Sequence, residues 1–144
     1  METVRDVMST DVESCTPLDN VYEVAVKMKE LNVGAIPIID DGNEQLIGMI
    51  TDRDLVVRGI AEKRAGSNQV TNVMSEELIT CSPEMSLEEA STLMAKHQIR
   101  RLPVVENGQL IGIVSLGDLA TYKMSNESAG EALSEISEKN FTQH

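Results

Sequence analysis

The chain contains its sequence pattern twice, and this internal repeat limits its fold more than any other feature. Ten residues of the first copy recur 66 positions later; they are Val4, Val7, Met8, Ser9, Cys15, Pro17, Glu23, Met28, Pro37 and Gly42. After Gly108 the offset falls to 64, so that Leu46-Ile47-Gly48 matches Leu110-Ile111-Gly112. The first copy therefore carries two extra residues near Asn43, which indicates a surface turn. Repeated units of this kind are expected to pack against each other.

Each copy predicts a strand, a helix, two further strands and a last helix. Asn20 with Glu23, and Ser86 with Glu89, have the spacing of a capping box, and apolar residues follow each pair at helical spacing. Two short apolar runs come next in each copy, separated by turn residues such as Asn107-Gly108, which indicates a hairpin. The expected fold is α+β (α/β in the broad sense): two β-α-β-β-α repeats packed through their sheets about a pseudo-twofold axis.

Length and spacing predict four segments. Residues 1–61 form the first repeat, 62–69 a linker with Gly66-Ser67-Asn68, 70–124 the second repeat, and 125–144 an acidic tail with a marginal helix. The whole chain of 144 residues has the size of one domain. A unit of about 60 residues buries only about 60% of its unfolded surface, so we expect neither repeat to be stable alone.

Composition limits the partners of the chain. A net charge of −12 argues against binding to nucleic acid or an anionic membrane, and only 2% of residues are aromatic, so stacking platforms for bases are not expected. No apolar stretch approaches the roughly 20 residues of a membrane span. The first residues also lack the pattern of a secretory signal. We therefore expect a soluble, cytoplasmic protein.

Two equivalent segments carry the candidate site chemistry, Gly48 to Asp54 and Gly112 to Asp118. Each consists of a glycine, two apolar residues, a hydroxyl residue, two variable residues and an aspartate. Ligands of open sheets bind beyond the carboxyl ends of strands, and a carboxylate there can accept hydrogen bonds from both ribose hydroxyls. The alternative is structural, because Thr-x-x-Asp is itself a capping box that starts a helix without any ligand. Spacing alone leaves both interpretations open.

The repeat, the Ile36-Pro37 and Leu102-Pro103 pairs and these two segments together resemble a tandem pair of CBS domains, the Bateman module. The resemblance covers nearly all of residues 1–124. It implies a regulatory module that binds AMP, ADP, ATP or S-adenosylmethionine between the repeats. The ligand-binding residues that it implies are Thr16, Ile36, Pro37, Thr51, Asp54, Ser82, Leu102, Pro103, Ser115 and Asp118. Among these, the aspartates and hydroxyl residues would hold ribose, the strand positions would contact the base, and Thr16 and Ser82 would line the opposite site.

Three arginines distinguish the two copies. Arg100 and Arg101 precede Leu102-Pro103, at positions where the resemblance implies phosphate contacts, whereas Gly34 and Ala35 stand there in the first copy. Arg53 lies within the first Thr-x-x-Asp segment. In an acidic chain these side chains are candidates for a local anion site, and their alternative role is solvation or pairing with surface acids. We expect Arg100 and Arg101 to share one cleft with Asp118.

Few other residues suggest chemistry. Cys15 and Cys81 occupy equivalent positions without Cys-x-x-Cys spacing, so buried thiols are favoured over a metal site or a disulfide. Neither His97 nor His144 has a partner that would form a catalytic dyad. Asp52 and Asp54 could together hold Mg²⁺, although Leu116 replaces Asp52 in the second copy.

The leading hypothesis is therefore a stand-alone, non-catalytic sensor of an adenosyl ligand, which needs no cofactor or metal. We expect it to form a homodimer and to signal to a protein partner that the sequence does not identify. One alternative is an orphan scaffold that dimerises and docks to a protein without binding nucleotide. A second is a nucleotide-processing enzyme that uses Asp52 and Asp54 with a metal.

Overall fold

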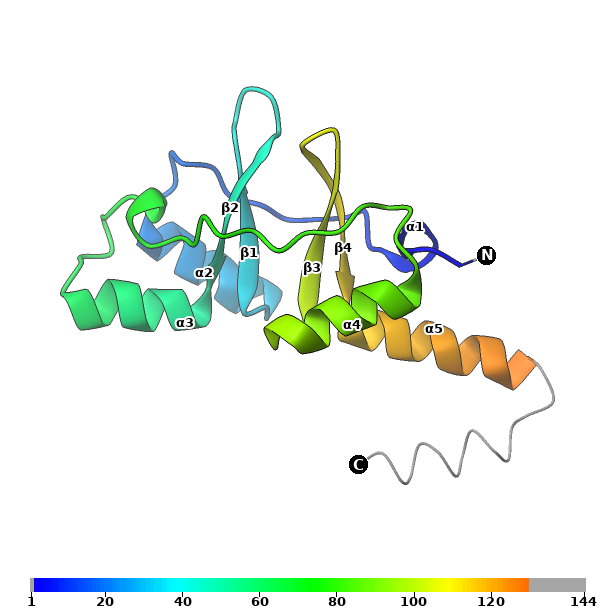
Figure 1. Ribbon diagram of the computed structural model, residues 1–144. Coiled ribbons are helices and arrows are strands. Elements are labelled where there is room, and N and C mark those ends of the chain that lie inside the picture. The colour runs from blue at the N-terminus through cyan, green and yellow to red at the C-terminus, as the bar shows by residue number, and fades with distance from the viewer. Residues whose placement is uncertain (1, 130–144) are drawn as a thin grey trace.

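The computed structural model describes residues 2–129, and the same order of elements occurs in it twice (Figure 1). In the first repeat these are α2 (Val21–Leu31), β1 (Ala35–Ile39), β2 (Leu46–Thr51) and α3 (Asp52–Asp54), which continues as a π turn over Leu55–Gly59 and a 3-10 turn over Ile60–Glu62. In the second they are α4 (Leu87–His97), β3 (Arg101–Glu106), β4 (Gln109–Ser115) and α5 (Leu116–Ala129). Each repeat begins with a leading segment that carries one short helix. These are α1 (Val4–Val7) in the first repeat and the 3-10 helix Val70–Asn72 in the second.

Both expected capping boxes start a helix. The Asn20 side chain accepts from the Glu23 amide at 2.8 Å, and Glu23 Oε1 accepts from the Asn20 amide at 2.9 Å. Ser86 and Glu89 exchange the same pair of bonds at 3.0 and 3.3 Å at the start of α4. These bonds satisfy amides that have no partner within the helix, so each helix begins where its sequence predicts.

Both hairpins are confirmed. β1 pairs antiparallel with β2 from Ala35↔Thr51 to Ile39↔Leu46, and β3 pairs with β4 in the same way. Asn107 and Gly108 both have positive φ, at 55° and 81°, which is the requirement of a two-residue type I′ turn. The two small antiparallel sheets and the helices beside them confirm the α+β class.

The first strand predicted in each repeat is reduced to a single bridged residue in the structure. Cys15 pairs with Ile38 only as an isolated parallel bridge, and Cys81 pairs with Val104 in the same way. Pro17 lies two residues after Cys15, and Pro83 lies two residues after Cys81. Neither proline has an amide hydrogen that could extend the strand pairing. Each sheet therefore has two strands and one bridged segment.

The repeats exchange their leading segments. Val4 is fully buried in the core of the second repeat, whereas Val70, Val73 and Met74 belong to the core of the first. In Figure 1, α1 lies on the side of β3, β4 and α5, and the segment before α4 crosses both sheets. Each core is completed by residues that come before the other repeat in the chain, which gives a physical reason for the expected instability of a single copy.

Besides the exchanged leading segments, hydrogen bonds between the hairpin tips connect the two sheets. The Gln45 side-chain amide donates to the Asn107 backbone carbonyl at 3.3 Å, and the Gln109 side-chain amide donates to the Asn43 backbone carbonyl at 3.1 Å. The Leu46 amide adds a backbone bond to the Gly108 carbonyl at 3.1 Å. The sheets are thus tied together at the end that lies farthest from Thr51 and Ser115.

The two cysteines are buried and free, as expected from their repeated positions. Burial raises the pKa of both the Cys15 and Cys81 thiols from 9.0 to about 11, so both stay protonated at neutral pH.

Within the described residues no helix is long and apolar enough to cross a membrane. Helix α5 ends at Ala129, and residues 130–144, which hold most of the predicted tail segment and His144, lie outside the described residues.

We expect Gly112→Ala to destabilise the fold. A Cβ at Gly112 would lie 2.9 Å from the Ser9 carbonyl oxygen and 2.8 Å from Met8 Sδ, and the carbonyl belongs to a bridge that fixes the leading segment. Overpacking of this kind costs about 1–3 kcal/mol, so urea unfolding should show a lower midpoint. Gly117→Ala is the matched control, because its nearest atom is Ser115 Oγ at 3.7 Å. Equal stability of the two variants would contradict the close contact at Gly112.

Candidate functional site

The candidate residues gather where each hairpin passes into the following helix. The Thr51 amide donates to Asp54 Oδ2 at 2.9 Å, and the Asp54 amide donates to Thr51 Oγ1 at 3.1 Å. Ser115 and Asp118 make the same two bonds at 3.1 and 3.0 Å. The capping-box interpretation of both segments is therefore confirmed as a structural role.

Capping uses only one oxygen of each carboxylate. In the part of the chain that the structure describes, Oδ1 of Asp54 and Oδ1 of Asp118 have no hydrogen-bond partner. Both side chains are half-buried and line hollows of the surface. The structural role and a ligand-binding role are thus compatible, because the cap holds the carboxylate still and leaves one acceptor oxygen available.

Two clefts lie at these helix starts, and we name each after its aspartate. The Asp54 cleft has a volume of about 1090 Å³ and is lined by Thr51 and Asp54 together with Ile99, Arg100, Arg101 and Pro103. The Asp118 cleft has a volume of about 320 Å³ and is lined by Ser115 and Asp118 together with Val33, Ala35, Ile36 and Pro37. The Asp118 cleft therefore combines the helix start of the second repeat with the proline-containing strand of the first, whereas the Asp54 cleft reaches Pro103 and also Ser115 and Leu116 at the second helix start.

This arrangement corrects the expected grouping of the arginines. Arg100 lines the Asp54 cleft and does not line the Asp118 cleft, whereas Arg101 lines both. Arg53 also lines the Asp54 cleft. The physical reason is that the Asp54 cleft lies between the two helix starts. It includes Ser115, and the Leu116 amide donates to the Arg100 carbonyl at 2.8 Å, so Arg100 stays beside the second helix start while it lines the cleft of Asp54.

Three predicted residues lie in neither cleft. Leu102 is fully buried in the core of the second repeat, because side chains alternate along β3 and its neighbours Arg101 and Pro103 face the clefts instead. Thr16 accepts from the Leu18 amide at 3.2 Å in a turn, and Ser82 is exposed at the equivalent position. Ile36 is 1% exposed and reaches only the Asp118 cleft.

Other residues line the clefts in place of Thr16 and Ser82, and the sequence analysis does not single them out. Asp11, Val12 and Glu13 line the Asp118 cleft, and Glu77 and Ile79 line the Asp54 cleft. Both walls follow the repeated triplet Val-Met-Ser, whose serine bridges to the last strand of the opposite repeat. That triplet is the sequence signal from which they could have been found.

The three candidate arginines are exposed and form no ion pair within the described residues. Arg5 shows the contrast, since it pairs with Glu84 at 2.9 Å and Glu106 at 3.0 Å, and these carboxylates raise its pKa. Within residues 2–129 the cleft arginines therefore pair with none of the surface acids. They remain available to an anion.

A metal role finds little support in the described region. Asp52 Oδ1 accepts from the Arg53 amide at 2.8 Å, and one oxygen of Asp54 is held in the cap. No group of three or more His, Cys, Asp and Glu side chains in residues 2–129 could hold a metal ion. His97 is exposed and lines neither cleft.

Comparison with known proteins identifies the family. The CBS domain model matches residues 4–59 and 70–125, so the chain belongs to the CBS domain family and carries a tandem pair. It is 53% identical over 141 residues to the CBS domain-containing protein YhcV of Bacillus subtilis (strain 168), covering 98% of this chain and 99% of that protein.

Two solved structures have the same fold. The structure of CBSX2 in complex with AMP superposes with a TM-score of 0.78 at 28% identity, covering 88% of this chain and 99% of that chain. Hypoxic Response Protein I with two coordinated zinc ions gives a TM-score of 0.77 at 32% identity, covering 85% and 99%. The first of these structures holds AMP, and the second holds zinc ions.

Asp118→Ala should destabilise the free protein more than Asp118→Asn. Alanine removes the acceptor of the Ser115 amide, whereas the single oxygen of asparagine can keep that bond. Loss of such a cap costs about 1 kcal/mol, or roughly 2–4 °C in melting temperature for a chain of this size. Thermal unfolding followed by circular dichroism measures the difference. If asparagine is as harmful as alanine, the capping bond does not account for the role of Asp118.

Proposed function

We propose that the chain is a stand-alone sensor that binds an adenosine-containing ligand, such as AMP, ADP, ATP or S-adenosylmethionine, between its two repeats. The observation that carries the proposal is the second carboxylate oxygen of Asp54 and Asp118, which has no partner in the described chain and lines a cleft. The structure of CBSX2, a protein of the same fold, is a complex with AMP, which supports the choice of ligand class.

The cleft residues match the parts of a nucleoside. The free oxygen of Asp54 can accept from the ribose hydroxyls, and the Thr51 hydroxyl, whose oxygen already accepts from the Asp54 amide, can donate its hydrogen. Ile79, Ile99 and Pro103 supply an apolar wall for the base. This division into one apolar wall and a few fixed polar groups is typical of small-molecule sites.

Signalling follows from the composition of the clefts. A ligand in either cleft touches both repeats, so the free energy of binding depends on how the two repeats sit relative to each other. A ligand can shift a conformational equilibrium only by its difference in affinity for the two states, and contacts to both repeats provide such a difference. We propose that this shift, without catalysis or a cofactor, is the output that a partner protein recognises.

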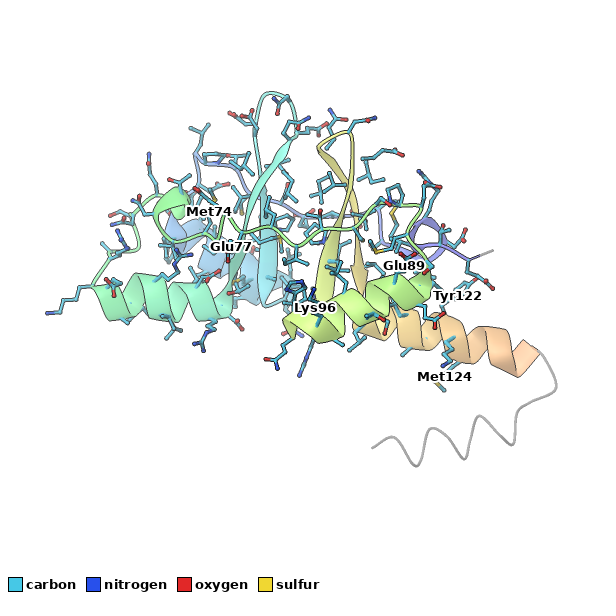
Figure 2. All side chains as sticks on the ribbon, in the orientation of Figure 1. Met74, Glu77, Glu89, Lys96, Tyr122 and Met124 are labelled. Atoms are coloured by element: carbon cyan, nitrogen blue, oxygen red, sulfur yellow. The ribbon has the colours of Figure 1, made fainter. Side chains whose placement is uncertain are left out.

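We also propose that the chain acts as a homodimer through its outer helical surface. Val56 and Ile60, on the turns that continue α3, are 56% and 73% exposed, and Leu116 and Met124 on α5 are 43% and 45% exposed. Figure 2 shows Met124 on the side of α5 that faces away from the sheets. A second copy would cover these side chains.

The orphan scaffold is the second candidate. The capping bonds involve only backbone amides of the chain itself, so the two aspartates would start their helices even in a protein that binds no nucleotide. The two candidates differ in one measurable property, which is whether adenosyl ligands bind the free chain.

Adenine nucleotides should raise the melting temperature. A ligand that binds only the native state adds about 2.7 kcal/mol at about a hundredfold excess over Kd, which corresponds to roughly 5–11 °C at about 2–4 °C per kcal/mol. Thermal shift with AMP, ADP, ATP and S-adenosylmethionine measures this effect, with GMP as a control that should shift it less. The orphan scaffold becomes the better account if no adenosyl ligand moves the transition and calorimetry detects no heat of binding.

A further inference from the structure

We propose that the two clefts take ligands of different charge, an inference that rests on the proposed function. The Asp54 cleft binds a nucleotide with a phosphate group. The Asp118 cleft binds a nucleoside without phosphate, either neutral or cationic. The chain would then bind two different ligands, one in each cleft.

Comparison of equivalent positions carries the proposal. Where the Asp118 cleft has Glu13 in its wall, the Asp54 cleft has Ile79, 66 positions later. Arg53 and Arg100 line the Asp54 cleft and are absent from the lining of the Asp118 cleft; their sequence counterparts Gly117 and Gly34 also lie in the Asp54 cleft. Each of these three differences makes the Asp54 cleft more positive than the Asp118 cleft.

One difference has the opposite sign. Asp52 lines the Asp54 cleft, and its counterpart is Leu116. Even so, the lining of the Asp54 cleft holds three arginines and three carboxylates, whereas the lining of the Asp118 cleft holds one arginine and three carboxylates. The Asp118 cleft therefore carries the excess of negative charge, which disfavours a phosphate group.

The acidic wall of the Asp118 cleft is held in place at both ends. The Ser9 amide donates to the Ile113 carbonyl at 2.8 Å, and the Cys15 amide donates to the Pro37 carbonyl at 3.0 Å. Between these bonds, Glu13 approaches Lys27 only at 3.9 Å, and Lys27 Nζ donates at 3.0 Å to the Ser14 carbonyl. The backbone of the wall is thus fixed at both ends, and Glu13 is only weakly neutralised.

Cleft size agrees with charge. The Asp118 cleft, at about 320 Å³, is at the lower limit of the roughly 300–1000 Å³ typical of ligand sites, whereas the Asp54 cleft measures about 1090 Å³. The larger cleft has room for a phosphate group beyond the nucleoside. Arg101 lines both clefts and does not discriminate between them, so Arg100 is the residue to change.

The test is calorimetric titration of the full chain with AMP and with S-adenosylmethionine. Arg100→Gln should weaken AMP binding by about tenfold or more, because a charge-assisted hydrogen bond is lost, and should change S-adenosylmethionine binding less than about twofold. Lys123→Gln is the matched control: it removes the same charge from an exposed position of α5 that lines neither cleft, and it should leave both affinities unchanged.

Two aspartate variants assign each ligand to its cleft. Asp54→Asn should weaken AMP far more than S-adenosylmethionine, and Asp118→Asn should do the reverse; in both, the single side-chain oxygen keeps the cap and an amide donor replaces the free acceptor. The inference is overturned if one variant abolishes both ligands, or if Arg100→Gln affects them equally. If the wild-type chain binds neither ligand, the proposed function itself fails.

Discussion

The reciprocal backbone bridges between the repeats are the constraint on which the rest of the structure depends. Ser9 and Ile113 exchange hydrogen bonds at 2.8 and 2.9 Å, and Ser75 and Met49 do so at 2.8 and 3.0 Å. Each bridge attaches the segment that leads into one repeat to the last strand of the other. The same attachment places Val4 and Val70 in the cores of the opposite repeats and lays the walls of both clefts over the strand ends. Core and site therefore form together.

In each cleft one aspartate serves both the helix cap and the proposed binding of a ligand. One oxygen of Asp54 or Asp118 satisfies the amide at a helix start, and the other oxygen lines the cleft without a partner in the described chain. A carboxylate that is already fixed by its cap loses little conformational freedom when a ligand binds, which favours affinity. Pro37 of the first repeat lines the Asp118 cleft and Pro103 of the second lines the Asp54 cleft. Under the proposed function, a bound ligand would therefore touch both repeats and would act on their relative arrangement.

Local features of this chain could be predicted from the sequence, and features that depend on distant pairing could not. The capping boxes at Asn20 and Ser86 and the Asn107-Gly108 turn follow from hydrogen bonds or φ angles within four residues. The exchange of leading segments pairs residues that are distant in the chain, as with Ser9 and Ile113 or Met49 and Ser75, and no local pattern specifies it. The position of the Asp54 cleft between the two helix starts also depends on the packing of the two repeats. The sequence therefore places Arg100 beside Asp118, whereas it lines the cleft of Asp54, and it does not single out the walls at Glu13 and Ile79.

A crystal structure of the full chain grown with AMP tests the central claim most directly. The account predicts density for the nucleotide in the Asp54 cleft, with the ribose hydroxyls on the oxygen of Asp54 that the cap leaves available. It also predicts contacts from both repeats to the same nucleotide, because the cleft is lined by both. AMP bound away from both clefts, or held by one repeat only, would contradict the claim that this chain senses its ligand at the contact between its repeats.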